Sequence, residues 1–201
     1  SVSTIGTPLA IVPFYLLPSW ILSHYDIAYD DVRARLLIVA TERFAAASMT
    51  ALSALLLFVT ARRLTSWRWA LAIALVYGVG TSAWSISSQA LWPHALSALC
   101  LAALSAVFVA RVPQAWDSGL ARLIAALMVI NRPQTAPFVA LAAFHSWRCG
   151  VRQFLFFSLV PAVGGMMTIA YNLAVFRSLV GSYGTLNHFS TPLYEGAYGL
   201  L

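Results

Sequence analysis

Residues 120–147, LARLIAALMVINRPQTAPFVALAAFHSW, decide how this chain is organised. The apolar runs on either side of Asn131-Arg132-Pro133 would rise about 18 Å and about 22 Å as helices, so each is shorter than the roughly 30 Å hydrocarbon core of a bilayer. The stretch is therefore either one kinked span or a hairpin with residues 131–135 at its turn. The hairpin is favoured, because it puts all the flanking arginines on one side of the membrane, as the positive-inside rule prefers; these are Arg111, Arg122, Arg148 and Arg152.

The composition is that of a membrane protein. The 201 residues are 61% hydrophobic and 9% charged, values that exclude a soluble globular domain and predict a polytopic membrane protein. All 12 basic residues are arginines in or near short loops, so membrane topology explains the net charge of +6 better than nucleic-acid binding does. The sequence context of Cys100 and Cys149 predicts neither a disulfide nor a metal site.

The distribution of charge predicts an all-α bundle of about six spans, with both ends of the chain outside the cell membrane. The expected spans cover 44–61, 69–88, 95–110, 120–131, 133–147 and 154–176. Residues 1–23 carry Pro8, Pro13 and Pro18, which favour an interfacial or re-entrant helix over a full crossing. Asp30 or Asp31 is the expected N-cap of the helix that follows.

Small residues recur every four positions in two of the expected helices. One stripe consists of Ala70, Ala74, Gly78 and Ser82, and the other of Ala98, Ala102, Ala106 and Ala110. Such stripes let neighbouring helices approach closely in a membrane. The chain begins without methionine and closes on an apolar run, so we expect one transmembrane domain, 1–201, that is an internal piece of a longer protein.

Arg132 is the first candidate binding residue. A charge between two apolar helices is a functional candidate, because facing lipid would be costly. A guanidinium binds phosphate in a bidentate manner. The alternative is that Arg132 merely reaches a lipid headgroup.

Further candidates lie in the expected outer loops. His94 is suited to donate to a phosphate, or is a solvated loop histidine. Arg43, next to Glu42, is a second phosphate-binding candidate or an interfacial anchor. Tyr183, His188 and Glu195 have the side chains that bind sugars, although their loop is equally suited to cover the surface. The outer histidines lack metal-ligand spacing, so no metal site or other cofactor is predicted, and a divalent ion would need convergence in three dimensions.

Short motifs follow one another along nearly the whole chain. Residues 5–9 (IGTPL) are similar to the signal PPG-x-PL, and Asn131-Arg132-Pro133 is similar to a T/N-R/K-P break between two short helices. Further motifs are Arg43 with the ARRL run at 61–64, the segment 80–94, and the loops 176–183 and 189–200. In this order the motifs resemble those of the GT-C glycosyltransferases, especially the dolichyl-phosphate-mannose mannosyltransferase-like members and their bacterial relatives. The departures are Gly6-Thr7 in the first motif, and Leu179-Val180 in place of Pro-Leu.

The resemblance implies a cell-membrane glycosyltransferase, hexosyl or pentosyl, that moves a sugar from a polyprenyl-phosphate carrier on the extracytoplasmic face. The acceptor would be a lipid, a glycan or a protein, the remaining partners would be membrane lipids, and no nucleic acid is expected. It also implies that the catalytic aspartate lies upstream of residue 1, so no catalytic residue is assigned here. The alternative is a non-enzymatic transporter or scaffold for lipids or polysaccharide, because broken helices also mark transporters.

Overall fold

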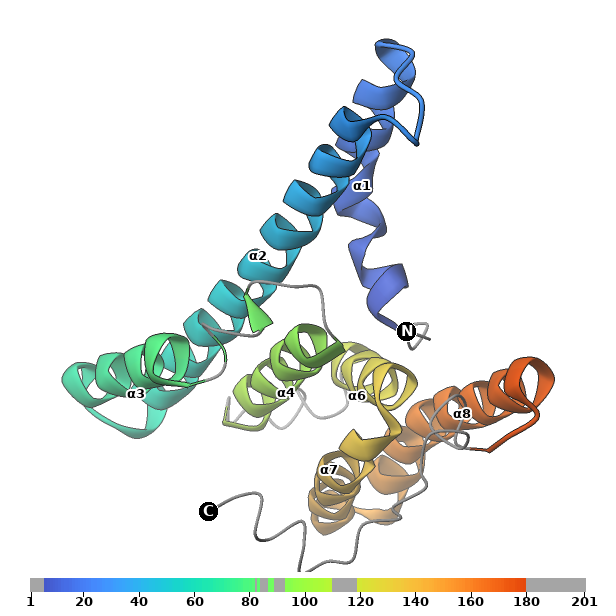
Figure 1. Ribbon diagram of the computed structural model, residues 1–201. Helices are drawn as coiled ribbons and strands as arrows, with labels where there is room; N and C mark the ends of the chain where they lie inside the picture. The colour runs from blue at the N-terminus through green and yellow to red at the C-terminus, as the bar shows by residue number, and fades with distance from the viewer. Residues whose placement is uncertain (1–5, 82, 84–86, 89–92, 110–118, 180–201) are drawn as a thin grey trace, which may run out of the picture. The chain divides into compact units, whose positions relative to one another are not determined.

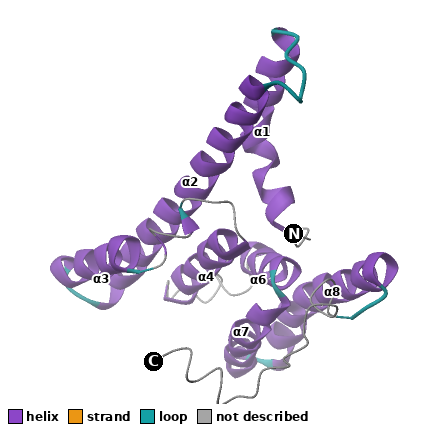
Figure 2. Ribbon diagram, in the orientation of Figure 1, coloured by secondary structure: helices purple, strands orange, loops and turns teal. Residues whose placement is uncertain are grey.

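Apolar runs form helices throughout the part of the chain that the structure describes, residues 6–81, 83, 87–88, 93–109 and 119–179. The computed structural model is all-α in these residues, as predicted (Figures 1 and 2). It contains seven α-helices and one 3-10 turn there: α1 (Gly6–His24), α2 (Val32–Leu64), α3 (Trp67–Gly80), α4 (Pro93–Val109), α6 (Gly119–Asn131), η2 (Pro133–Thr135), α7 (Ala136–Cys149) and α8 (Val151–Phe176).

By their contacts, residues 3–165 form one compact unit and residues 166–201 another, which begins within α8. Three helices, α1, α2 and α8, are long and apolar enough to cross a membrane. Many large apolar side chains are exposed along the helices, including Leu141, Phe144 and Leu155. Exposed apolar surface of this extent is typical of a protein that contacts lipid.

The N-terminal segment, expected to be an interfacial or re-entrant helix, is helical and is long and apolar enough to cross a membrane. Residues 6–24 form one continuous helix, α1, with Pro13 and Pro18 inside it. Each proline removes a single backbone hydrogen bond, and the surrounding turns keep the helix together. The helix pairs with the first half of α2, because Phe14 packs edge-on against Phe44 at 6.1 Å and the Tyr15 hydroxyl donates to Glu42 at 3.1 Å.

The ends of α2 and α3 follow from local chemistry. Asp31 is the N-cap of α2, as predicted, and its carboxylate accepts from the backbone N–H of Arg33 at 2.8 Å. The expected span 69–88 is too long, since α3 ends at Gly80. Thr81 is extended, with φ −117° and ψ 176°, and its hydroxyl accepts from the backbone N–H of Ala83 at 3.2 Å, a local bond that competes with helix continuation.

The stripe of small residues on α3 faces α2. Ala70 and Ala74 are buried, and a Cβ on Gly78 would lie 3.9 Å from the Cβ of Ala54. The two backbones approach closely there, which is the packing that small residues allow between membrane helices. The prediction of a close helix contact at Ala70, Ala74 and Gly78 is confirmed.

Contacts at the helix ends fix the direction of α4, α6 and α7. At the start of α4, Ser97 accepts a hydrogen bond from Asn131, the last residue of α6. At the other end of α4, the Phe108 ring packs against His145 near the end of α7, with ring centroids 5.7 Å apart. Helix α6 therefore runs antiparallel to α4, and α7 runs back in the direction of α4. The predicted hairpin is confirmed, and the alternative of one kinked rod is wrong.

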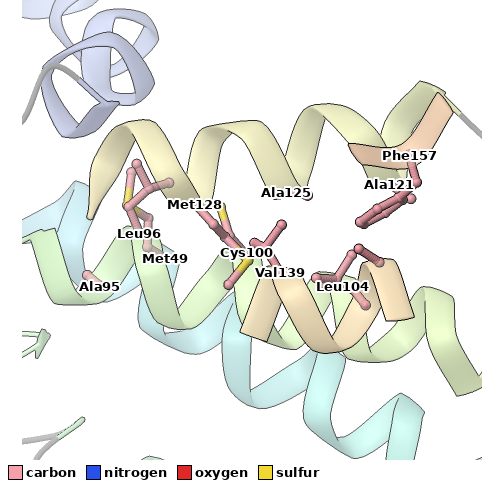
Figure 3. Close-up of a cluster of buried hydrophobic side chains, with 12 residues drawn as sticks. Met49, Ala95, Leu96, Cys100, Leu104, Ala121, Ala125, Met128, Val139 and Phe157 are labelled. Carbon is pink, nitrogen blue, oxygen red and sulfur yellow. The ribbon is translucent and has the colours of Figure 1, made fainter. Parts of the chain in front are cut away.

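The core of residues 3–165 lies where these helices meet. Figure 3 shows Leu96, Cys100 and Leu104 of α4 close to Met128 and Ala125 of α6. The cluster also includes Met49 of α2, Val139, Ala142 and Ala143 of α7, and Phe157 of α8. Alanines at the contact surfaces bring the helices close enough for dispersion forces to hold them, which matters because lipid provides little hydrophobic drive for helix association.

Enlarging one of these alanines is expected to weaken the bundle. Ala125 is fully buried, so Ala125→Leu should lower the free energy of unfolding by about 1–3 kcal/mol through overpacking. Denaturant unfolding of the purified protein in detergent measures the effect. The exposed Ala140 on α7 is the matched control, since Ala140→Leu adds the same atoms without a clash. Equal stability of the two variants would contradict the assigned core.

Candidate functional site

The break between α6 and α7 is built by Pro133. Proline has no backbone N–H and forces the preceding residue out of the helical region, and Arg132 accordingly has φ −150° and ψ 107°. The Thr135 hydroxyl lies 2.9 Å from the carbonyl oxygen of Met128 and 2.7 Å from that of Arg132. The same two carbonyls also accept backbone N–H groups, that of Met128 from Arg132 and that of Arg132 from Thr135, each at 2.9 Å. The break is a fixed turn that presents the Arg132 side chain.

Arg132 meets His94, which lies 38 residues earlier in the chain at the start of α4. The guanidinium Nη1 contacts the imidazole Nδ1 and lies 3.4 Å from Nε2. Its Nη2 donates to the Oε1 of Gln134 at 2.9 Å. We call His94, Arg132 and Gln134 the arginine site. His94 and Gln134 are exposed and Arg132 is half-buried, so an external ligand has access to the site.

The charge balance of the arginine site favours an anion. Burial, and then the neighbouring Arg132, lower the pKa of His94, so the imidazole is neutral near pH 7 and accepts from the guanidinium. Arginine has five N–H donors, and no acidic side chain among the described residues pairs with Arg132. The site therefore holds a cation whose charge is not neutralised by a described carboxylate.

Three polar side chains, the buried Thr7 and Asn131 and the half-buried Ser97, lie beside the arginine site; we call this group the polar junction. The Thr7 hydroxyl donates to Asn131 Oδ1 at 2.7 Å, and Asn131 Nδ2 donates to the hydroxyl of Ser97 at 2.9 Å. Asn131 is 0% exposed and Thr7 is 3% exposed. The start of α1, the first turn of α4 and the end of α6 meet at this point.

The other predicted site residues do not join this group within the described residues. Arg43 is exposed on α2, and no hydrogen bond or ion pair links it to Arg132 or His94. Its neighbour Glu42 accepts from the Tyr15 hydroxyl. Tyr183, His188 and Glu195 lie outside the described residues. No group of metal-ligating side chains occurs among the residues searched, those that the structure describes.

Sequence reasoning missed the polar junction and Gln134. Asn131 was visible as a polar residue at the end of an apolar run, but its partner Thr7 is 124 residues away and its partner Ser97 is 34 residues away. No spacing rule connects them. Gln134 lies two residues after Arg132, and its position in the predicted turn was a usable signal.

The opposite ends of the helices carry several arginines. Arg122 of α6 and Arg152 of α8 both lie over the ring of Phe156, at 5.6 Å and 5.5 Å from its centroid. Arg63 of α2 donates to the carbonyl of Ala106 near the end of α4 at 3.4 Å. Of the four flanking arginines, Arg122, Arg148 and Arg152 lie at this end, and Arg111 lies outside the described residues. We call this end of the helices, which carries Arg63, Arg122 and Arg152, the arginine end.

The described carboxylates are distant from the arginine site. Asp26, Asp30 and Asp31 follow the far end of α1, whose 19 residues span about 28 Å from the polar junction. Glu42 lies beside Tyr15, in the middle of α1. None of these acids is therefore positioned to act on a group bound at Arg132.

Comparison with known proteins adds no relative: no protein-family model, no curated protein and no solved structure matches this chain.

Proposed function

We propose that the arginine site binds the phosphate of a polyprenyl-phosphate sugar, and that the protein is a membrane glycosyltransferase using this lipid as donor. The single observation that supports the proposal most is Arg132 at a helix break, bonded to a neutral histidine and a glutamine and, among the described residues, not to a carboxylate. A guanidinium in this state keeps its charge for a ligand anion. The apolar surface of the surrounding helices suits the lipid part of such a donor.

The chemistry assigned to the site is stabilisation of the leaving phosphate. As the glycosidic bond to phosphate breaks, negative charge grows on the phosphate oxygens, and preorganised donors at those oxygens lower the barrier. Arg132 supplies N–H donors, and His94 supplies one more when it is protonated. Deprotonation of the acceptor hydroxyl needs a base, which must come from outside the described residues, because the described carboxylates lie elsewhere.

The proposal includes a direction across the membrane. The arginine end, with Arg63, Arg122 and Arg152, would face the cytoplasm under the positive-inside rule. The arginine site would then face the extracytoplasmic side of a cell membrane crossed about six times. A lipid carrier displayed on that side has its phosphate at the level of the helix ends, which is where Arg132 lies relative to α4 and α6.

One observation favours a second candidate function, transport of a lipid or polysaccharide without catalysis. Helices α6 and α7 are short and interrupted at Arg132, and discontinuous helices often line the binding sites of transporters. Both functions use the same anion site. Transfer of label from a polyprenyl-phosphate sugar to an acceptor distinguishes them, since transport leaves the donor intact.

Removing the guanidinium should abolish most phosphate recognition. We expect Arg132→Ala to weaken binding of farnesyl phosphate, a short polyprenyl phosphate, by about 10–100-fold, because hydrogen bonds to a charged group contribute about 1.5–3 kcal/mol. Isothermal titration calorimetry on the purified protein measures the Kd.

Two controls accompany this measurement. Arg68→Ala removes the same charge from an exposed position at the start of α3 and should leave the Kd unchanged. Farnesol, which lacks the phosphate, should bind wild type and Arg132→Ala equally. An unchanged Kd for farnesyl phosphate in Arg132→Ala would end the proposal.

Binding should also depend on the protonation of His94. Burial and Arg132 lower the pKa of His94 in the free protein, whereas a bound anion raises it. Protonation of His94 therefore contributes its full gain in affinity below the pKa of His94 in the free protein. This gain is lost as pH rises through the higher pKa of His94 in the complex. We expect tighter binding of farnesyl phosphate as pH falls from about 7.5 to about 5.5.

The variant His94→Gln separates the titration of His94 from the titration of the ligand phosphate. The ligand titrates identically in measurements on wild type and on His94→Gln. The pH profile of Kd should be flatter in His94→Gln than in wild type. Identical profiles would exclude a role for the imidazole.

Cysteine labelling tests the direction across the membrane. Gln134 and Cys149 are exposed at the two ends of the α6–α7 hairpin, whereas Cys100 is buried. In intact cells, a membrane-impermeant maleimide should label Gln134→Cys in a Cys149→Ser background. The native Cys149 should react only after permeabilisation. The reverse pattern would place the arginine site in the cytoplasm and contradict the proposed orientation.

A further inference from the structure

We propose that Asn131 is a positioning residue for the arginine site: its amide ties α1 and α4 to the end of α6 and thereby holds Arg132 against His94. The ligand-binding part of this inference rests on the proposed function. The assignment itself rests on the geometry of the polar junction, which does not depend on the identity of the ligand.

The Asn131 amide joins three helices through its two ends. Its oxygen accepts from Thr7 of α1 at 2.7 Å, and its nitrogen donates to Ser97 of α4 at 2.9 Å. Buried hydroxyls elsewhere behave differently. Thr50 and Ser146 each donate to the carbonyl four residues earlier in their own helix. Those bonds satisfy a polar group locally, whereas the Asn131 bonds fix helices against one another.

The backbones at the polar junction are in direct contact. A Cβ placed on Gly6 would lie 2.8 Å from the Cβ of Asn131, 2.9 Å from its Cα and 3.1 Å from its backbone nitrogen. No larger residue fits between α1 and α6 without a shift of the backbone. The start of α1 is therefore held by shape as well as by the hydrogen bond from Thr7.

Both partners of the arginine–histidine contact are adjacent to the Asn131 bonds. Arg132 is the next residue along the chain. Ser97 lies three residues after His94, so the two side chains are neighbours on one face of α4. A displacement of α4 relative to α6 at Ser97 therefore moves His94 away from Arg132. Because a buried amide without its partners costs free energy, the junction resists such a displacement.

The test compares binding of farnesyl phosphate with the integrity of the fold. Asn131→Ala should weaken binding by about tenfold although Arg132 is intact. Thr7→Val, which removes only the hydroxyl, should act in the same direction, and Thr7→Ser should restore wild-type binding. Ser146→Ala is the matched control, because Ser146 is equally buried but bonds within α7, and its Kd should not change.

A second pair of variants moves α1 without touching a polar group. Gly6→Ala forces α1 away from Asn131, and it should weaken binding as Asn131→Ala does. Gly119→Ala adds the same methyl group at the start of α6, where no atom lies within 4 Å, and it should bind as wild type.

A ligand-independent measurement separates the two proposals. The pH midpoint for modification of His94 by diethylpyrocarbonate, followed by mass spectrometry, should lie below the ordinary imidazole value in wild type. In Asn131→Ala it should rise toward that value, because Arg132 no longer faces His94. An unchanged midpoint in Asn131→Ala would overturn the positioning role. Loss of binding in Arg132→Ala but not in Asn131→Ala would also overturn it, whereas unchanged binding in Arg132→Ala would overturn only the proposed function.

Discussion

The missing backbone donor of Pro133 is the constraint on which the rest of the site depends. It ends α6 at Asn131, forces Arg132 into an extended conformation and allows α7 to turn back beside α4. An unbroken helix would have carried Arg132 into the middle of an apolar rod, where its charge has no partner. The break instead places Arg132 at a helix end, next to the first turn of α4.

Small residues let the helices around this break approach closely, and a few large side chains such as Leu104 and Met128 fill the space between them. Ala121, Ala125 and Ala142 are buried at the contacts among α4, α6 and α7, where close approach gains dispersion energy that lipid cannot supply. Polar groups in such an interior need partners. Buried hydroxyls such as those of Thr50 and Ser146 bond to their own helix, but Asn131 bonds across to α1 and α4. Rigidity at the arginine site therefore arises from a few short contacts.

Charge is separated along the helices. One end carries Arg63, Arg122 and Arg152, and the other end carries Arg132 with a neutral His94. The described acids lie away from Arg132, near α1 and the start of α2. This separation supports the proposal of an anion site, since a nearby carboxylate would neutralise the guanidinium. It also explains why the proposed transfer reaction needs a base from outside the described residues.

The sequence by itself determined the properties that depend on neighbours along the chain. The all-helical class and the break at Pro133 follow from the apolar runs and the chemistry of proline, and the N-cap of α2 was narrowed to Asp30 or Asp31. Helix α1 stays intact through two prolines, whereas α3 ends at Gly80, before the expected end near Ser88.

Only the tertiary structure decided which distant side chains meet. Arg132 and His94 were expected to lie on the same surface of the protein, but not in contact. The hydrogen bonds from Asn131 to Thr7 and Ser97 were not expected at all. Hydrogen bonds between residues 34 and 124 positions apart have no local signature. They exist because helix packing brings three helix ends to one point, and packing depends on all the contacts of the bundle at once.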